Sequence, residues 1–156
     1  MSKTRRTFAV DTNCIVAALS PLHMHHRAAL AECGRRLDRG EHMVVPASAL
    51  IEAYAVLTRL PMPQRLEPSD AMTLLDANFL KQGQVVGTDP ARVPDLLRLF
   101  VDSGVAGGRT YDALIAEAAR EAGADVILTF NRRHFEPAPH GVAVVEPADD
   151  PPGGGA

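Results

Sequence analysis

The most constraining feature of this 156-residue sequence is a short apolar stretch that ends in an acid. Residues 6–10 include the run Phe-Ala-Val and lead directly into Asp11. An apolar run of this length between polar residues predicts a strand that is buried on both faces. Such a strand has no room for a charge in its middle, so Asp11 is expected at its carboxyl end. Ligand sites in open parallel α/β sheets form at that end.

The rest of the chain alternates strand and helix patterns. Short apolar runs predict further strands over 43–45, 84–86, 126–128 and 142–145. Helical spacing, with Ser48, Ser69 or Asp70, and Thr110 as expected capping residues, predicts helices over 14–19, 23–37, 48–57, 69–80, 90–101 and 110–122. In the helix that Pro90 opens, the expected buried stripe is Val93, Leu96, Leu97, Phe100 and Val101.

The alternation predicts one α/β domain with a mostly parallel five-stranded sheet between two layers of helices, a three-layer α/β/α architecture. We expect this domain to span residues 1–146. The Pro/Gly/Asp-rich stretch 147–156 has nothing to bury and is expected to be a disordered tail.

Composition and charge exclude several classes of protein. The net charge is -3 and the aromatic content is 4% with no Trp, which argues against a basic nucleic-acid binder and against a base-stacking platform. Residues 1–40 are nevertheless basic, and this patch is either a guide for a polyanion or a solvated helix face. Cys14 and Cys33 fit no metal-site spacing and suit a reducing compartment. No apolar run reaches the length of a membrane span, so we expect a cytoplasmic protein.

Four polar side chains are expected to meet at one edge of the sheet. Asp11 ends the first strand, Asn131 follows the fourth, and Glu52 and Asp112 lie near the starts of two helices. A pair of like charges 4 Å apart repels by about 4 kcal/mol at an effective dielectric constant near 20, so gathered carboxylates favour a bound cation. Oxygen ligands point to Mg²⁺ or Mn²⁺, and the matching chemistry is phosphodiester hydrolysis.

Each of these residues also has a structural interpretation. Asp112 favours the dipole of its helix, Glu52 is one acid on an amphipathic helix, and Asn131 suits a turn. Asp11 is the hardest to explain structurally, because an acid that closes a buried strand needs a partner. A separate cluster of His23, His25 and His26 lacks a third ligand at zinc spacing, so a helix start near this edge is the better interpretation.

The motifs around these acids resemble the PIN-domain ribonucleases, especially the VapC-type toxins of bacterial toxin–antitoxin pairs. The matching segments appear in family order and span roughly residues 8–135; they are Val10–Asn13, Glu52–Arg59, Tyr111–Ala116 and Leu128–Phe135. The resemblance implies a Rossmann-like sheet and a metal-dependent endoribonuclease. It also implies a homodimer and a VapB-like antitoxin that blocks the acidic pocket.

The resemblance also implies roles for individual residues. Asp11, Glu52 and Asp112 match the central acids that bind Mg²⁺ or Mn²⁺. Asn131 stands where many members have a fourth acid, so one negative charge is missing here. Thr129 matches a hydroxyl that supports Asp11. Charge and position make four arginines candidates to contact RNA phosphates: Arg59, Arg109, Arg132 and Arg133.

Two other classes of function stay open at this point. A phosphatase or phosphotransferase would use Asp11 as its nucleophile, but such families usually carry a second acid two residues later, where this chain has Asn13. A catalytically weak PIN-like module that binds RNA or serves as a scaffold is the other alternative, and the amide at Asn131 is its support.

Overall fold

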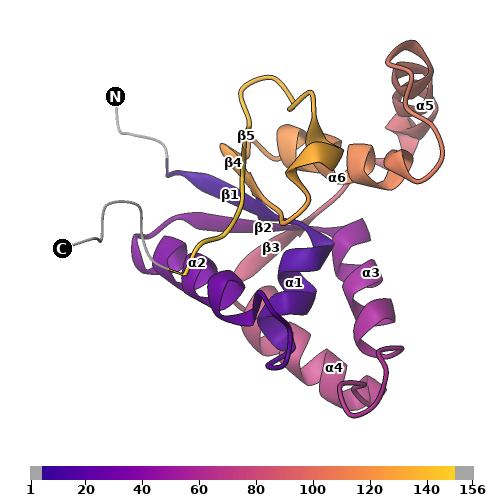
Figure 1. The fold of residues 1–156 in the computed structure, drawn as a ribbon. Helices are drawn as coiled ribbons and strands as arrows, with labels where there is room; N and C mark the ends of the chain where they lie inside the picture. Colours follow the sequence, from indigo (N-terminus) through magenta and orange to yellow (C-terminus); the bar gives the residue numbers. More distant parts are fainter. Residues whose placement is uncertain (1–4, 150–156) are drawn as a thin grey trace.

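The computed structural model describes residues 5–149 (Figure 1). Five strands are present: β1 (Thr7–Val10), β2 (His42–Pro46), β3 (Gly83–Val86), β4 (Val126–Leu128) and β5 (Ala143–Val145). The α-helices are α1 (Thr12–Leu19), α2 (His26–Asp38), α3 (Ala47–Leu57), α4 (Pro68–Leu75), α5 (Val93–Asp102) and α6 (Arg109–Glu121). Shorter helical segments are η1 (Asp76–Leu80), η2 (Pro90–Arg92) and η3 (Arg132–Phe135).

The five strands form one all-parallel sheet in the order β3-β2-β1-β4-β5. Helices α1 to α4 lie on one side of this sheet and α5 and α6 on the other (Figure 1). Right-handed crossovers explain this division, because the connections from β1 to β3 move toward one edge and those from β3 to β5 move toward the other. The predicted three-layer α/β/α fold is confirmed, and the sheet is parallel throughout.

The core is aliphatic and centred on the sheet. All four residues of β1, the three of β4 and most of β2 are buried, as expected for parallel strands covered on both faces. A cluster of charged side chains is also buried beside this core: Arg36 of α2 donates to Glu32 at 3.0 Å and to Glu41 at 2.9 Å. Paired in this way, the buried charges are satisfied.

Most predicted helix starts are wrong by one to three residues. Helix α1 begins two residues early, with Asp11 as its cap, and α2 begins three residues late, at His26. Helix α3 follows Pro46 without Ser48 as its cap, and α4 begins at Pro68, before Ser69 and Asp70. Proline is favoured at the first position of a helix, as in α4, because its φ is preset and it has no N–H to satisfy. In α6, Gly108 occupies the cap position, so Thr110 lies inside the first turn.

Two other predicted helices also differ from the structure. The helix expected over 69–80 becomes a π-helix after Leu75, where the Asn78 side chain donates to the Leu74 carbonyl at 2.8 Å. In α5 only Leu96 and Phe100 of the predicted stripe are buried. Val93, Leu97 and Val101 are exposed because α5 lies at the outer end of the molecule, where one side of the helix is covered (Figure 1).

The start of the predicted tail is held against α2. Pro147 is buried, and Arg35 donates to the carbonyl oxygens of Ala148 and Asp149 at 2.6 and 2.9 Å. Residues 147–149 therefore belong with the folded domain, and the rest of the predicted tail lies outside the described residues. Across residues 5–149 the structure has no helix with the length and apolar character to cross a membrane.

Candidate active site at the carboxyl edge of the sheet

The sheet topology brings the ends of β1 and β4 together. Val10 pairs with Leu128, so the next residues in register are Asp11 and Thr129. Strand β1 lies between β2 and β4, and the crossovers on its two sides run in opposite directions. This is the topological switch point of a doubly wound sheet, where the loops separate and leave a crevice.

Asp11 is fixed in this crevice by two hydrogen bonds. Its side chain caps α1, because Oδ1 accepts from the Thr12 backbone N–H at 2.7 Å. The Thr129 hydroxyl donates to Oδ2 at 2.7 Å. Asp11 is only 4% exposed, so its orientation is set by protein atoms. A carboxylate offers about four lone-pair positions, and two remain for another ligand.

Thr129 connects three parts of the site. Besides donating to Asp11, its hydroxyl oxygen accepts from the Asn13 side-chain amide at 3.2 Å and from the Asn131 backbone N–H at 3.0 Å. Asn13 also accepts from the Phe130 backbone N–H at 3.2 Å. A hydroxyl has one donor and two acceptor positions, so Thr129 is saturated. The first turn of α1 and the end of β4 are thereby fixed to each other.

The other two acids reach the crevice from helices. Glu52 lies in the second turn of α3, and its Oε2 accepts from the Thr12 hydroxyl at 3.0 Å. Thr12 thus links Glu52 to Asp11 through its hydroxyl and its backbone N–H. Asp112 lies in the first turn of α6, where the Nδ1 atom of His134 is 3.4 Å from its Oδ2.

The three acids influence one another electrostatically. The pKa of Asp11 is raised from 3.8 to about 6, chiefly by burial; the hydrogen bonds from Thr129 and Thr12 oppose this rise, and the charges of Asp112 and Glu52 contribute to it. Burial likewise raises the pKa of Asp112; Glu52 adds to this effect, whereas His134 and Arg109 oppose it. The crevice therefore holds an excess of negative charge.

These residues have the chemistry of a site for a hard divalent cation. Their ligand atoms are carboxylate oxygens, and a cation would relieve the repulsion that raises their pKa values. Within residues 5–149 no three His, Cys, Asp or Glu side chains already stand at the spacing of a formed metal site. Glu52 is exposed and Asp112 is partly exposed, so both side chains have room to turn toward an ion.

The structure separates the candidate arginines into two groups. Arg109, in the first turn of α6, is close enough to lower the pKa of Asp112, and Arg132 and Arg133 are exposed on η3 beside His134. Arg59 follows the end of α3, roughly 10 Å beyond Glu52 along the helix axis. It therefore lies away from the acids.

Asn131 takes part in the site through its backbone N–H. Its N–H supports Thr129, and its side chain is exposed.

Sequence reasoning assigned no role to several residues that the structure places in the site. Thr12 and Asn13 directly follow Asp11, and that adjacency was the available signal. His134 gave no periodic signal, because its contact with Asp112 depends on how η3 folds back toward α6.

The histidine cluster forms contacts other than metal ligation. The His25 ring stacks on Phe130 at a centroid distance of 4.2 Å and an interplanar angle of 10°. His26 donates from Nδ1 to the Ala17 carbonyl at 2.8 Å. His25 therefore packs on the segment that contains Thr129 and Asn131, which agrees with the expected helix start near this edge.

Comparisons with known proteins agree with this geometry. A family model described as PIN domain matches residues 8–139. Ribonuclease VapC40 of Mycobacterium tuberculosis is 35% identical over 119 residues, which cover 76% of this chain and 83% of that protein.

Two solved structures share the fold. The crystal structure of VapC20 from Mycobacterium tuberculosis, a sarcin–ricin loop cleaving toxin, has a TM-score of 0.64 at 16% identity and covers 87% of this chain and 98% of that chain. VapBC2 from Rickettsia felis, bound to a DNA fragment from its promoter, has a TM-score of 0.64 at 17% identity, with 91% and 99% covered.

Proposed function

The chain belongs to the PIN-domain family, and we propose that it is an endoribonuclease that hydrolyses phosphodiester bonds of RNA. The observation that supports this proposal best is the state of Asp11. Its carboxylate is oriented by Thr12 and Thr129, and burial, together with the charges of two neighbouring acids, raises its pKa. Buried acids of this kind at a sheet's switch point are typical of active sites. The named relative, Ribonuclease VapC40, supports RNA as the substrate.

Asp11, Glu52 and Asp112 would hold one divalent cation, Mg²⁺ or Mn²⁺. When bound, this cation supplies a water of lowered pKa and neutralises charge on the phosphate. The protein's own contribution is orientation: Thr129 fixes one oxygen of Asp11, and Thr12 fixes its other oxygen and Glu52. Such outer contacts hold ligands in the orientation that a metal needs.

Substrate binding falls to the exposed cations around the acids. Arg109, Arg132 and Arg133 lie on α6 and η3, at the same edge of the sheet as Asp112, and their guanidinium groups suit phosphate oxygens. His134 holds Asp112 from the same side. Arg59 lies too far along α3 to belong to this group.

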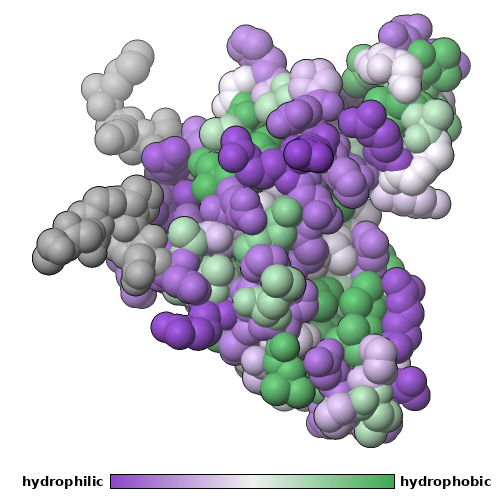
Figure 2. All heavy atoms as spheres, in the orientation of Figure 1, coloured by the Kyte–Doolittle hydropathy of each residue, from purple (hydrophilic) through white to green (hydrophobic). Residues whose placement is uncertain are grey.

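We further propose that the chain is the toxic component of a type II toxin–antitoxin pair in the cytoplasm, with a VapB-like antitoxin as partner and a homodimer as its own assembly. Its relatives include VapC ribonucleases, and its structural neighbours include VapBC complexes. Apolar side chains gathered over α5 are exposed (Figure 2), and Val101 reaches 78%. An apolar helix face of this kind is typical of a protein interaction surface.

The test is cleavage of single-stranded RNA by the purified protein with Mg²⁺ or Mn²⁺. Asp11→Asn keeps the shape of the side chain and removes its charge, so cleavage should fall on the order of 100-fold or more. Asp70→Asn, which changes an exposed acid on α4, is the matched control and should cleave like the wild type.

Equal cleavage by the wild type and Asp11→Asn would refute this mechanism. RNA binding without cleavage by the wild type would favour the alternative of a catalytically weak RNA-binding module. A phosphatase with Asp11 as nucleophile would instead leave a covalent phosphoaspartate. Such a phosphatase needs a second acid at position 13. This chain has Asn13 there, and its side chain forms hydrogen bonds with Thr129 and with the Phe130 backbone N–H.

A further inference from the structure

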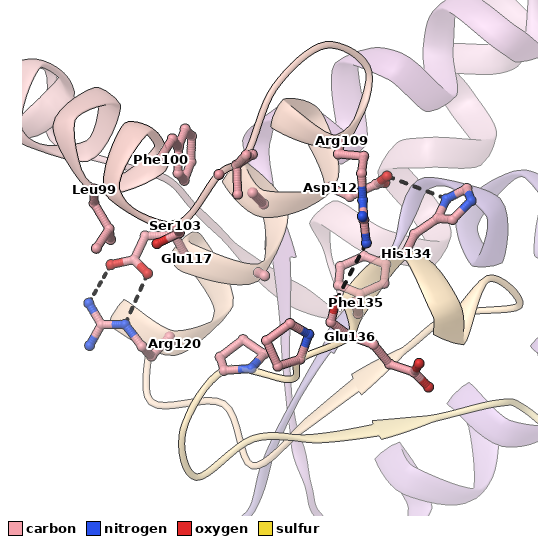
Figure 3. A pocket seen from close by; sticks show the side chains of 16 residues that line it. Leu99, Phe100, Ser103, Arg109, Asp112, Glu117, Arg120, His134, Phe135 and Glu136 are labelled. Atoms are coloured by element: carbon pink, nitrogen blue, oxygen red, sulfur yellow. Dashed lines mark hydrogen bonds and ion pairs between the residues drawn. The ribbon is translucent and has the colours of Figure 1, made fainter.

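A hollow of 420 Å³ lies beside the acids, between α5, α6 and residues 134–139 (Figure 3). Its volume lies within the range of small-molecule binding sites. One wall is a single face of α6, because residues three and four apart on a helix lie on the same side. On this face Asp112 stands at one end, Glu117 and Arg120 stand at the other, and the small side chains of Ala113 and Ala116 lie between them.

The hollow is continuous with the proposed cleavage site. Asp112 belongs to both, and Arg109 extends beside it to the segment opposite, where it donates to the Glu136 carbonyl at 3.5 Å (Figure 3). An RNA strand whose phosphate lies at the acids has its neighbouring base within reach of this opening. The guanidinium group of Arg109, between the acids and the hollow, can contact the phosphate of that nucleotide.

The far end of the hollow presents a fixed guanidinium group. Arg120 donates from Nε to Glu117 at 3.0 Å, and its Nη2 atom pairs with the other carboxylate oxygen. The side chain of Glu117 is 12% exposed and that of Arg120 is 43% exposed, so a nearly buried carboxylate holds a guanidinium group that stays accessible. Two of five N–H donors are used in this pair, and the remaining donors and the planar face stay available.

The remaining walls are mostly apolar. Phe100 comes from α5 and Phe135 from η3 (Figure 3), and Pro137 and Pro139 also line the hollow. Phe100 and Phe135 are 8% and 3% exposed, so they close the wall of the hollow, and the exposed planar group in it is the guanidinium of Arg120. An oriented guanidinium plane is a feature that receives splayed-out bases of single-stranded RNA. Because Glu117 already neutralises Arg120, the end of the hollow suits an uncharged planar group better than a charged peptide side chain.

We propose that this hollow binds one nucleobase of the RNA strand, next to the phosphate that is cleaved, with Arg120 facing the acceptor edge of the base. The proposal rests on the ribonuclease function proposed above and makes the hollow a determinant of sequence preference. Arg120 and the alanine floor then decide which base precedes or follows the cut.

The first test measures binding apart from cleavage. The four nucleosides, which carry a base and no phosphate, are titrated into the ¹⁵N-labelled full chain without metal, and amide shifts are followed by NMR. Saturable shifts are expected at Ala113, Ala116 and Glu117. Arg120→Ala should weaken binding about tenfold, in line with the loss of a stacking or hydrogen-bonding partner of a base. Ala116→Leu fills the floor and should abolish binding.

Arg98→Ala is the matched control. Arg98 forms an ion pair with Asp95 at 2.6 Å, with the same three-residue spacing as the Glu117–Arg120 pair, but lies outside the hollow. Its nucleoside binding should equal that of the wild type, and thermal unfolding checks that each variant is folded. The absence of saturable shifts on α6, or equal weakening by Arg98→Ala and Arg120→Ala, would overturn the proposal.

The second test reads base preference from the ends of products cut from a pool of randomised RNA oligonucleotides. The wild type and Arg98→Ala should prefer particular bases at one position beside the cut, and Arg120→Ala should lose that preference. Unchanged preference in Arg120→Ala, with weakened inhibition by an antitoxin, would assign the hollow to a peptide and overturn the proposal. Nucleoside binding without any RNA cleavage would instead refute the ribonuclease function alone.

Discussion

Replacing Asp11 by asparagine should remove a pH-dependent loss of stability from the metal-free protein while it abolishes activity. The asparagine oxygen can accept from the Thr12 N–H, but its amide then faces the Thr129 hydroxyl, whose acceptor positions are filled, so the hydrogen bond from Thr129 is lost at every pH. The substitution also removes a charge that is buried at 4% exposure beside two other acids. Active-site groups held in unfavourable surroundings commonly lower the stability of an enzyme. The pH-dependent part of the change therefore measures how unfavourable the surroundings of the charged Asp11 are.

The size of the effect follows from the pKa of Asp11. Folding raises this pKa from 3.8 to about 6, so between these pH values the folded protein binds more protons than the unfolded chain. The contribution of Asp11 to stability is therefore complete below pH 3.8 and is lost as the pH rises through 6. At 1.36 kcal/mol per pKa unit, the loss at pH 8 is about 3 kcal/mol.

The assay is thermal and denaturant unfolding in EDTA from pH 4 to pH 8, with Asp70→Asn as control. Between pH 4 and pH 8 the free energy of unfolding of Asp11→Asn should rise relative to the wild type by about 2–3 kcal/mol, or roughly 4–12 °C in Tm. Mg²⁺ should stabilise the wild type and leave Asp11→Asn unchanged. A stability difference between the two proteins that stays constant from pH 4 to pH 8 would refute the reasoning.

Three further changes test other contacts. Thr129→Val deletes the hydroxyl that donates to Asp11 and should lower the free energy of unfolding at pH 8 by about 1.5–3 kcal/mol. It should also move the acid limb of the pH–rate profile to higher pH, and an unmoved limb would contradict the assigned contact. His25→Ala loses the stack on Phe130 and should lower the free energy of unfolding, measured with denaturant, by about 0.5–1.5 kcal/mol. His25→Phe should keep the wild-type value, and an equal loss of stability in the two variants would refute a contribution from this stack. Arg36→Met removes the cation that Glu32 and Glu41 share and leaves them paired with Arg35 and Arg39 alone, so it should cost about 1.5–3 kcal/mol by the same measurement, whereas a loss below about 1 kcal/mol would show that the two remaining arginines are sufficient.

The sheet and the acids could be predicted because each has a local signal. Fully apolar runs identified β1, β2 and β4, and the polar residue that ends β1 placed Asp11 at the carboxyl edge. The alternation of strands and helices then placed Glu52 and Asp112 at helix starts on the same edge. Each inference uses a pattern of neighbouring residues, and the parallel sheet then places the predicted residues at the same edge.

Contacts between distant segments had no such signal. The exposure of Leu97 and Val101 depends on how far α5 projects from the body, which helical spacing does not encode. The contact of His134 with Asp112 and the stack of His25 on Phe130 depend on the paths of two loops. Helix starts differed where proline geometry, as at Pro68, outweighed side-chain capping.

The most direct test of the central claim is an anomalous difference map from crystals soaked in Mn²⁺. The claim is that Asp11, Glu52 and Asp112 together hold one divalent cation at the switch point. We expect a peak in contact with oxygens of Asp11, Glu52 and Asp112, at the distances of roughly 2.0–2.2 Å that small hard cations adopt. A map with no peak in this crevice, or with its only strong peak among other residues, would contradict the claim.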